Sequence, residues 1–336
     1  MNRRRLLLLL TTAAIAAPTT ASARKVTIKV GTVAPKGSVW HDALKRIDQR
    51  WKKASDGKVK LRIFPGGVAG DESDMLRKMR IGQLHMGSMT GVSLAQIARS
   101  ASILSVPMLI RSHEELDYVR ERMGPRLKKD LADKGFVVLA WGDAGWAHQF
   151  SKAPARTPDD FRKLKYLVWT GDPAGEKAWR ATKFNPVPLS STDVLSGLRT
   201  GMIEAFGTTP LFALSSQWFG LAKHMVAIKW SPLNGATLIT RKRWEKIPAE
   251  LRPQLEAIAI EESAKLQVQV RSLHDKAIGA MVDRGLKVHT PTPAEVIQWE
   301  KAAELAYPII RGEVIPADVF DEVRKLAAEY RAKSKN

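Results

Sequence analysis

Cysteine is absent from the 336-residue sequence. This absence excludes a disulfide framework, a thiolate metal site and a thiol nucleophile, so the fold must be stabilised by packing alone. Hydrophobic residues make up 44% of the chain, which is enough for a sizeable core. Because domains usually hold about 100 to 200 residues, we expect two lobes rather than one.

Long apolar runs are also missing after the first residues. Arg3, Arg4 and Arg5 form a basic start, the apolar run 6–17 follows, and Ala21-Ser22-Ala23 fits a small-residue cleavage site. This order predicts a signal peptide over residues 1–23 and export of the protein. The run is shorter than the roughly 20 residues of a spanning helix, which argues against an anchor. Arginines before leucines also fit a loose twin-arginine pattern, so the Sec and Tat routes both stay open.

Acidic residues are few relative to basic ones, 34 against 54, and the formal net charge is +20. Such an excess can indicate nucleic acid or an anionic membrane surface as a partner. The basic residues are spread along the chain, however, without a recognisable nucleic-acid motif. We therefore expect a solvated basic surface that can face anionic lipid headgroups, and no nucleic-acid partner.

Recognisable catalytic motifs are lacking as well. The seven histidines form no H-E-x-x-H pair, and the sequence has neither a P-loop nor a G-x-G-x-x-G after a strand. The run 190–193, Ser-Ser-Thr-Asp, has no neighbouring histidine in the sequence that could activate a serine nucleophile. These absences predict a protein that is not an enzyme and that uses neither a cofactor nor a metal ion. An exported enzyme remains an alternative hypothesis.

The sequence does contain an alternation of short β-type runs with longer helical ones, which is typical of an α/β architecture with mostly parallel sheets. The predicted helices are 38–54, 71–81, 174–182 and 192–200, and a helical pattern after Pro248 runs for about 35 residues to Gly285. A helix of that length can brace two lobes. The predicted strands are 26–31, 59–64, 84–88, 136–141, 146–151, 166–169, 186–189, 202–207, 225–230 and 236–240.

Several short stretches occur in an order that characterises one family. They are Ile63-Phe64-Pro65-Gly66-Gly67 with Gly70-Asp71, the run Met-Arg-Ile-Gly-Gln-Leu-His-Met at 79–86, Val106-Pro107-Met108-Leu109, and Leu139-Ala140-Trp141-Gly142 before Gly145-Trp146. Over nearly all of the chain after the leader, the sequence resembles the extracytoplasmic solute-binding subunits of TRAP transporters. The resemblance implies a periplasmic protein that closes over a ligand between two α/β lobes and delivers it to membrane permease subunits, without catalysis.

The resemblance also implies a division of the chain. We expect a two-lobed, type II-like periplasmic-binding-protein fold with a long lobe-bridging helix. Lobe I comprises 24–142 plus 234–290, lobe II comprises 143–233, and the C-terminal helices of 291–336 pack on the lobes. Crossing strands near 142–146 and 230–235 are expected to absorb the closing rotation.

Three departures from the family pattern concern the positions that would bind an anion. Leu167 stands where acidic-solute members carry the arginine of Lys-x-Arg, Ala147 stands where a second arginine is common, and the run Glu-Ala-Phe-Gly-Thr at 204–208 replaces Asp-Gly-x-Glu-Asn. A buried carboxylate without a guanidinium partner is costly. A cleft lined by Leu167, Trp169 and Phe206 should therefore favour a hydrophobic or amphipathic ligand.

Apolar clefts are found in a subgroup of this family that works with a periplasmic tetratricopeptide-repeat protein. This chain is similar to that subgroup in the missing arginines, and the similarity implies the same additional partner. A receptor for a conventional small organic acid, held by other basic residues, is the alternative.

The candidate ligand-binding residues are Trp40, Thr90, Trp146, His148, Leu167, Trp169, Phe206, Thr208, Thr209 and Phe212. Trp146 and Trp169 lie at family ligand positions near strand ends, where open α/β sheets bind ligands, and core packing is the alternative for both. Trp40 lies next to the N-terminus of a predicted helix, which can bind an anionic or polar end of a ligand. The alternative is that Ser38 only caps this helix and that Trp40 packs in the core. His148 is expected at the rim of the cleft rather than on a metal. The threonines offer hydroxyls, although Thr-Thr-Pro also suits a turn.

Overall fold

The computed structural model describes residues 25–334, so the signal peptide predicted over 1–23 lies outside the described part. The described residues form an α/β fold, as predicted. The strands are β1 (Val26–Thr32), β2 (Val59–Phe64), β3 (Met86–Thr90), β4 (Phe136–Ser151), β5 (Lys165–Trp169), β6 (Asn185–Leu189), β7 (Ala205–Thr208), β8 (His224–Thr240) and β9 (Lys287–His289).

The helices begin where polar side chains cap them. Ser38 and Asp71 accept hydrogen bonds from the backbone N–H groups of His41 and Asp74, which start the first two helices. The helices are α1 (Val39–Ala54), α2 (Glu72–Arg80), α3 (Gly91–Ala95), α4 (His113–Asp133), α5 (Pro158–Arg162), α6 (Pro173–Ala181), α7 (Val194–Thr200), α8 (Pro210–Ser215), α9 (Arg241–Trp244), α10 (Arg252–Val282), α11 (Pro293–Glu304), α12 (Tyr307–Ile310) and α13 (Ala317–Lys333).

The strands lie in the order β2-β1-β3-β8-β4-β7-β5-β6, and β9 pairs with β8. β1 is parallel to β2 and β3, and β5 is parallel to β6 and β7. Between these two parallel groups run β4 and β8, which are antiparallel to each other. The mostly parallel, two-part α/β fold with crossing strands is thus confirmed. The lobe limits at 142/143 and 233/234 fall inside β4 and β8 and stay a prediction.

The crossing strands are continuous, and in this respect the prediction of four separate strands was wrong. The runs 136–141 and 146–151 are both parts of β4, and 225–230 and 236–240 are both parts of β8. The register of β4 on β8 shifts between Asp143 and Trp146, where Gly145 has a positive φ of 91°. A bulge of this kind interrupts the side-chain alternation without ending the strand, which is why the sequence pattern breaks there.

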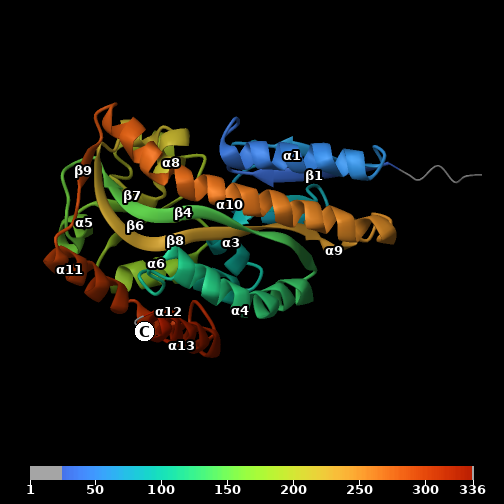
Figure 1. Ribbon diagram of the computed structural model, residues 1–336. Helices are drawn as coiled ribbons and strands as arrows, with labels where there is room; N and C mark the ends of the chain where they lie inside the picture. Colours follow the sequence, from blue (N-terminus) through green and yellow to red (C-terminus); the bar gives the residue numbers. More distant parts are fainter. Residues whose placement is uncertain (1–24, 335–336) are drawn as a thin grey trace, which may run out of the picture.

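Helix α10 lies along the crossing strands and contacts both parts of the molecule (Figure 1). The Trp51 indole of α1 donates to the Leu255 carbonyl at 2.9 Å, and the Ser263 hydroxyl donates to the Trp141 carbonyl of β4. Farther along, α10 packs against α8. The predicted long bracing helix is therefore confirmed, and it ends at Val282, shortly before Gly285.

The C-terminal helices α11, α12 and α13 pack against α4, α5 and α6 (Figure 1). Arg126 of α4 pairs with Asp318 and Glu322 of α13. Helix α4 was not predicted, although Ser112 accepts a hydrogen bond from the Glu115 N–H and the Ser-x-x-Glu spacing is a helix-start signal. None of the helices within residues 25–334 combines the length and apolar character that a membrane crossing needs.

Candidate functional site

A cleft opens where five parallel strands end. Thr32 ends β1, Thr90 ends β3, and Trp169, Leu189 and Thr208 end β5, β6 and β7; all five line its first pocket. Both parallel groups therefore contribute, as expected for a ligand site at the carboxyl ends of α/β strands. The crossing strands close the floor with residues 142–144 and 233–236.

A second pocket adjoins the first. Val92, Trp169 and Leu233 line both, so the two parts of the cleft share part of their wall. The second pocket passes the β5 strand and reaches the C-terminal helices, where Ala306 and Ile310 form part of its wall. The two volumes are about 130 Å³ and about 190 Å³. A single water needs roughly 10–15 Å³ on this measure, so the cleft has room for a solute of many atoms.

Among residues 25–334, the charged side chains that line the cleft are acidic. In the described part of the chain, no arginine, lysine or histidine lines either pocket. The acidic side chains of the lining accept hydrogen bonds from other groups of the protein. Glu72 accepts hydrogen bonds from the Thr90 N–H at 3.0 Å and from the hydroxyls of Thr90 and Ser93. Burial raises the pKa of the Glu72 carboxyl, against the opposing effect of these hydrogen bonds.

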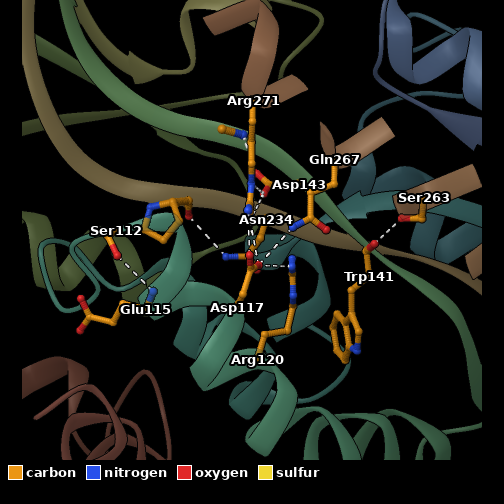
Figure 2. Close-up of polar contacts among 12 residues, drawn as sticks. Ser112, Glu115, Asp117, Arg120, Trp141, Asp143, Asn234, Ser263, Gln267 and Arg271 are labelled. Atoms are coloured by element: carbon orange, nitrogen blue, oxygen red, sulfur yellow. Dashed lines mark hydrogen bonds and ion pairs between the residues drawn. The ribbon is translucent and has the colours of Figure 1, made fainter. Parts of the chain in front are cut away.

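Asp143 of the β4 bulge lines the first pocket and is held by an ion-pair network (Figure 2). Arg271 of α10 lies 3.1 Å from the Asp143 carboxylate and donates to both Asp117 oxygens, at 2.7 and 2.8 Å. Burial opposes ionisation of Asp117, but the hydrogen bond from Arg271 and the charges of Arg120 and Arg271 hold the pKa of Asp117 below its usual range. The network fixes the cleft floor to α10 and α4.

Aromatic rings line one side of the first pocket and continue behind it. Trp40 of α1 lies 6.0 Å from Phe212 of α8, and its indole donates to the Asp143 carbonyl at 3.4 Å. Phe212 in turn contacts Trp218 at 5.3 Å, and Trp218 lies 6.4 Å from Trp169. Trp40 lies on α1, which follows β1, and Phe212 lies on α8, which follows β7 of the other parallel group. An apolar ligand face in the pocket would therefore contact rings from both parts of the molecule.

The candidate residues divide into two sets. Trp40, Thr90, Trp169, Thr208 and Phe212 line the first pocket, and Leu167 joins Trp169 along the second. The other candidates, Trp146, His148, Phe206 and Thr209, are each at most 3% exposed and line neither pocket.

Strand alternation and capping explain the second set. Phe206 stacks on Phe150 at 5.2 Å inside the core, while the adjacent Gly207 faces the cleft. Trp146 packs against His113 in another core cluster, at a ring distance of 5.9 Å. Thr209 caps α8 by accepting from the Phe212 N–H.

Three positions singled out as departures from an anion-binding pattern come together in the structure. Ala147 and Leu167 line the second pocket, and the run 204–208 contributes Gly207 to the second pocket and Thr208 to the first. The Leu167 side chain also belongs to the core cluster that contains Phe150 and Phe206. The three positions are therefore occupied by small or apolar side chains and by a threonine, and they lie around the two adjoining pockets.

Some lining residues were missed by the sequence reasoning. Ser191 lies in the first pocket, and its buried Oγ has no hydrogen-bond partner among the described residues. The run 190–193 was considered only for catalysis, so its hydroxyls were not assigned to a ligand. Glu72 directly follows Gly70-Asp71, one of the stretches that characterise the family, and this position was a signal that Glu72 lies near the ligand site. Ala306 and Ile310 gave no local signal, because only the tertiary packing of the C-terminal helices brings them to the cleft.

His148 was expected at the rim, but the structure buries it against α10. Its Nε2 lies 3.3 Å from Nε2 of His274, which no sequence spacing indicated. Burial, and then the charges of His274 and Lys229, lower the pKa of His148 to about 3. Burial also lowers the pKa of His274, with Lys229 acting in the same direction and Asp275 against it. Within residues 25–334, no three histidine or acidic side chains gather closely enough to hold a metal ion.

The His148–His274 pair predicts acid sensitivity. An unfolded histidine binds a proton near pH 6.5, whereas His148 in the folded chain stays neutral down to about pH 3. The free energy of unfolding should therefore fall as pH drops between these values, with a limiting slope of about 1.4 kcal/mol per pH unit for one histidine. Denaturant unfolding of the wild type and His148→Gln at pH 7 and pH 5 isolates this effect from the carboxylates. An equal loss in both proteins would refute it.

Comparison with known proteins gives a consistent result. The family profile described as bacterial extracellular solute-binding protein, family 7 (DctP), matches residues 30–311. The 2,3-diketo-L-gulonate-binding periplasmic protein of Escherichia coli is 27% identical over 81% of this chain and 83% of its own length. The C4-dicarboxylate-binding periplasmic protein of Rhodobacter capsulatus is 22% identical over 92% of this chain and 93% of its own.

Solved structures share the fold. A TRAP periplasmic solute-binding protein of Ralstonia eutropha, with bound (S)-2-acetolactate, has a TM-score of 0.84 at 20% identity and covers 90% of this chain and 99% of its own. One from Sulfurospirillum deleyianum, with bound succinate, has a TM-score of 0.83 at 21% identity and the same coverage. These proteins are all binding proteins, and the prediction of a receptor rather than an enzyme is confirmed. The chain belongs to family 7 of the bacterial extracellular solute-binding proteins, the DctP family.

Proposed function

We propose that this chain is the periplasmic receptor of a TRAP-type secondary transporter, and that it closes over a hydrophobic or amphipathic ligand and delivers it to membrane permease subunits. The observation that carries the ligand class is the lining of the cleft, to which residues 25–334 contribute no arginine, lysine or histidine. Family membership supports the receptor role, and the predicted leader supports export.

The energetics favour an uncharged ligand surface. A carboxylate taken into this cleft would lose its hydration without gaining a guanidinium partner, at a cost of several kcal/mol. Apolar ligand surface, by contrast, contributes about 25 cal/mol for each Å² buried. A moderately sized apolar ligand can then reach micromolar affinity after the costs of association.

A receptor for a small organic acid is the second candidate, because relatives favour it. Solved structures of the same fold carry succinate, (S)-2-acetolactate and L-galactonate. In this chain, such an acid would have to be held by hydroxyls and backbone N–H groups, for example around Thr90, Ser191 and Thr208. Hydrogen bonds of this kind do not supply the opposite charge that a buried carboxylate requires.

The proposal extends to the partners. Receptors of this family with apolar clefts work with a periplasmic tetratricopeptide-repeat protein, and the missing arginines support the same partner here. Pull-down of the exported protein from its own periplasm, followed by identification of a helical-repeat partner and the permease subunits, tests this part. Recovery of the permease subunits without a repeat protein would remove the additional partner from the proposal.

Native mass spectrometry of the purified receptor, before and after organic extraction, tests the ligand class. A receptor with an apolar cleft should retain a lipophilic molecule from the expression host, and extraction should remove the corresponding mass. A retained hydrophilic acid would favour the second candidate instead. Chromatography of the extract identifies the class of the molecule in either case.

Closure on binding is a further prediction of the receptor role. The β4 bulge at Asp143–Trp146 and the adjoining part of β8 lie between the two parallel groups and are expected to absorb the rotation. Small-angle X-ray scattering should then show a smaller radius of gyration in saturating dodecyl glycerol ether than in buffer. Succinate serves as the control and should leave the radius unchanged. An unchanged radius with a bound amphiphile would contradict the closure.

A further inference from the structure

We propose that the second pocket binds the apolar tail of an elongated amphiphile whose uncharged polar head lies in the first pocket. This inference rests on the proposed function and specifies its ligand. It assigns the second pocket, bounded by η1 (Arg99–Ser105), α6 and the C-terminal helices, to one hydrocarbon chain. The first pocket, with its hydroxyls, is assigned to the head.

The shared wall of the two pockets supports a ligand that spans both. Val92, Trp169 and Leu233 form part of the wall of both. Trp169 is only partly buried, so its ring offers contact surface at the junction. A ligand that spans both pockets would pass this ring, and the carboxylates of Glu72 and Asp143 in the first pocket are already held by hydrogen bonds within the protein.

The polar groups of the second pocket are largely engaged within the protein. Tyr166 donates to Gln149 at 2.6 Å, and Thr182 donates to the Trp179 carbonyl at 2.7 Å. Asp172 accepts from the Gly175 N–H at 2.9 Å, and burial raises the pKa of its carboxyl. A polar ligand group would therefore lose hydration here and find few free partners, whereas a hydrocarbon chain loses nothing of that kind.

The shape of the second pocket also fits a chain. Trp179 and Trp230 stack at 5.7 Å with an interplanar angle of 29°, and together they offer flat apolar surface. Small side chains of the C-terminal helices line the same pocket, among them Ala302, Ala303 and Ala306. Flat rings together with small apolar side chains suit a flexible methylene chain better than a hydrated polyol.

A hydroxyl without a hydrogen-bond partner supports the placement of the polar head in the first pocket. Ser191 Oγ is buried at the first pocket and has no hydrogen-bond partner among the described residues. A buried hydroxyl without a partner is costly, so a ligand oxygen or amide at this point would satisfy it. No cationic side chain lines the pocket in the described part of the chain, which disfavours an anionic head, and the carboxylates of Glu72 and Asp143 are already engaged within the protein. These two observations together favour an uncharged head such as a hydroxyl, ether or amide.

The test uses 1-O-alkyl glycerols in a homologous series from ethyl to dodecyl, titrated calorimetrically into the wild type and Ala306→Phe. Ala306 lines the second pocket, so phenylalanine should shorten it. In the wild type, each added methylene should improve the dissociation constant about fourfold until the pocket is filled. In Ala306→Phe the short chains should bind as before, and the improvement should stop several methylenes earlier. Leu305→Phe, at an exposed neighbouring position, is the control and should follow the wild type.

The possible failures are distinguishable. If none of the alkyl glycerols binds the wild type, the proposed function fails and the inference with it. If the series binds with the same chain-length dependence in the wild type and Ala306→Phe, the ligand class stands and the second pocket is not the tail site. Should Ala306→Phe lose its native circular dichroism, Ser102→Phe replaces it, because Ser102 lines the same pocket from a half-buried position. The same early plateau in Ser102→Phe supports the inference, and an unshifted plateau overturns it.

Discussion

Arg271→Met should lower the free energy of unfolding by about 3–5 kcal/mol, the range measured when one partner of a buried ion pair is removed. The Asp143 side chain is 1% exposed, and Arg271 is the cation that pairs with it in the described structure. Methionine keeps the apolar stem of the side chain but leaves the Asp143 carboxylate buried without a counter-charge. The change also removes the ion pair of Arg271 with Asp117 of α4, which keeps Arg120 and Gln267 as partners, so the floor of the cleft loses one of its links to α4 and α10.

Denaturant unfolding of wild type, Arg271→Met and Arg271→Met/Asp143→Asn measures this effect. The double variant should recover part of the loss, because it removes the unpaired charge. Arg180→Met is the matched control: its partner Glu176 lies on the same exposed helix face, and such pairs are worth at most about 1 kcal/mol. Equal losses for Arg271→Met and Arg180→Met would contradict the role of the network.

Trp169→Ala should weaken binding of a long-chain alkyl glycerol by about 2–4 kcal/mol, or roughly 30- to 1,000-fold. Trp169 ends β5 and lines both pockets, so its ring would contact the ligand at the junction. Its other ring contact is Trp218 at 6.4 Å, and its partial exposure limits the loss of core packing.

Isothermal titration calorimetry of the wild type, Trp169→Ala and Trp169→Phe measures this loss, with thermal melting as the check on folding. Phenylalanine retains an apolar ring and should keep most of the affinity. An alanine variant that melts like the wild type and binds within about twofold of it would place the ligand away from Trp169.

The elements that the sequence predicted well are those with local signals. Helix α10 has a long apolar periodicity, and β1, β2, β5 and β6 are short runs bounded by turn residues. Leu167 and Ala147 were recognisable because a family pattern gave them expected residues, and both line the second pocket. Alternation along β7 places neighbouring side chains on opposite faces of the sheet, so Gly207 lines the cleft, whereas Phe206, predicted there, points into the core.

The features that escaped prediction depend on tertiary contacts. β4 and β8 were divided because bulges and Pro232 interrupt their patterns, although their hydrogen bonding continues. His274 approaches His148 from a helix 126 residues away in sequence. The wall of the second pocket combines β5 with helices that follow it by more than a hundred residues, so no local pattern could outline that space.

Competitive calorimetry on the wild-type protein, stripped of bound lipid by organic extraction and refolded, tests the central claim most directly. Dodecyl glycerol ether is titrated alongside succinate and L-galactonate under identical conditions. The account predicts micromolar or tighter binding of the ether and no measurable heat from either acid, because neither pocket offers a cationic partner in the described part of the chain. Tight binding of an acid together with indifference to the ether would contradict it and establish the organic-acid receptor instead.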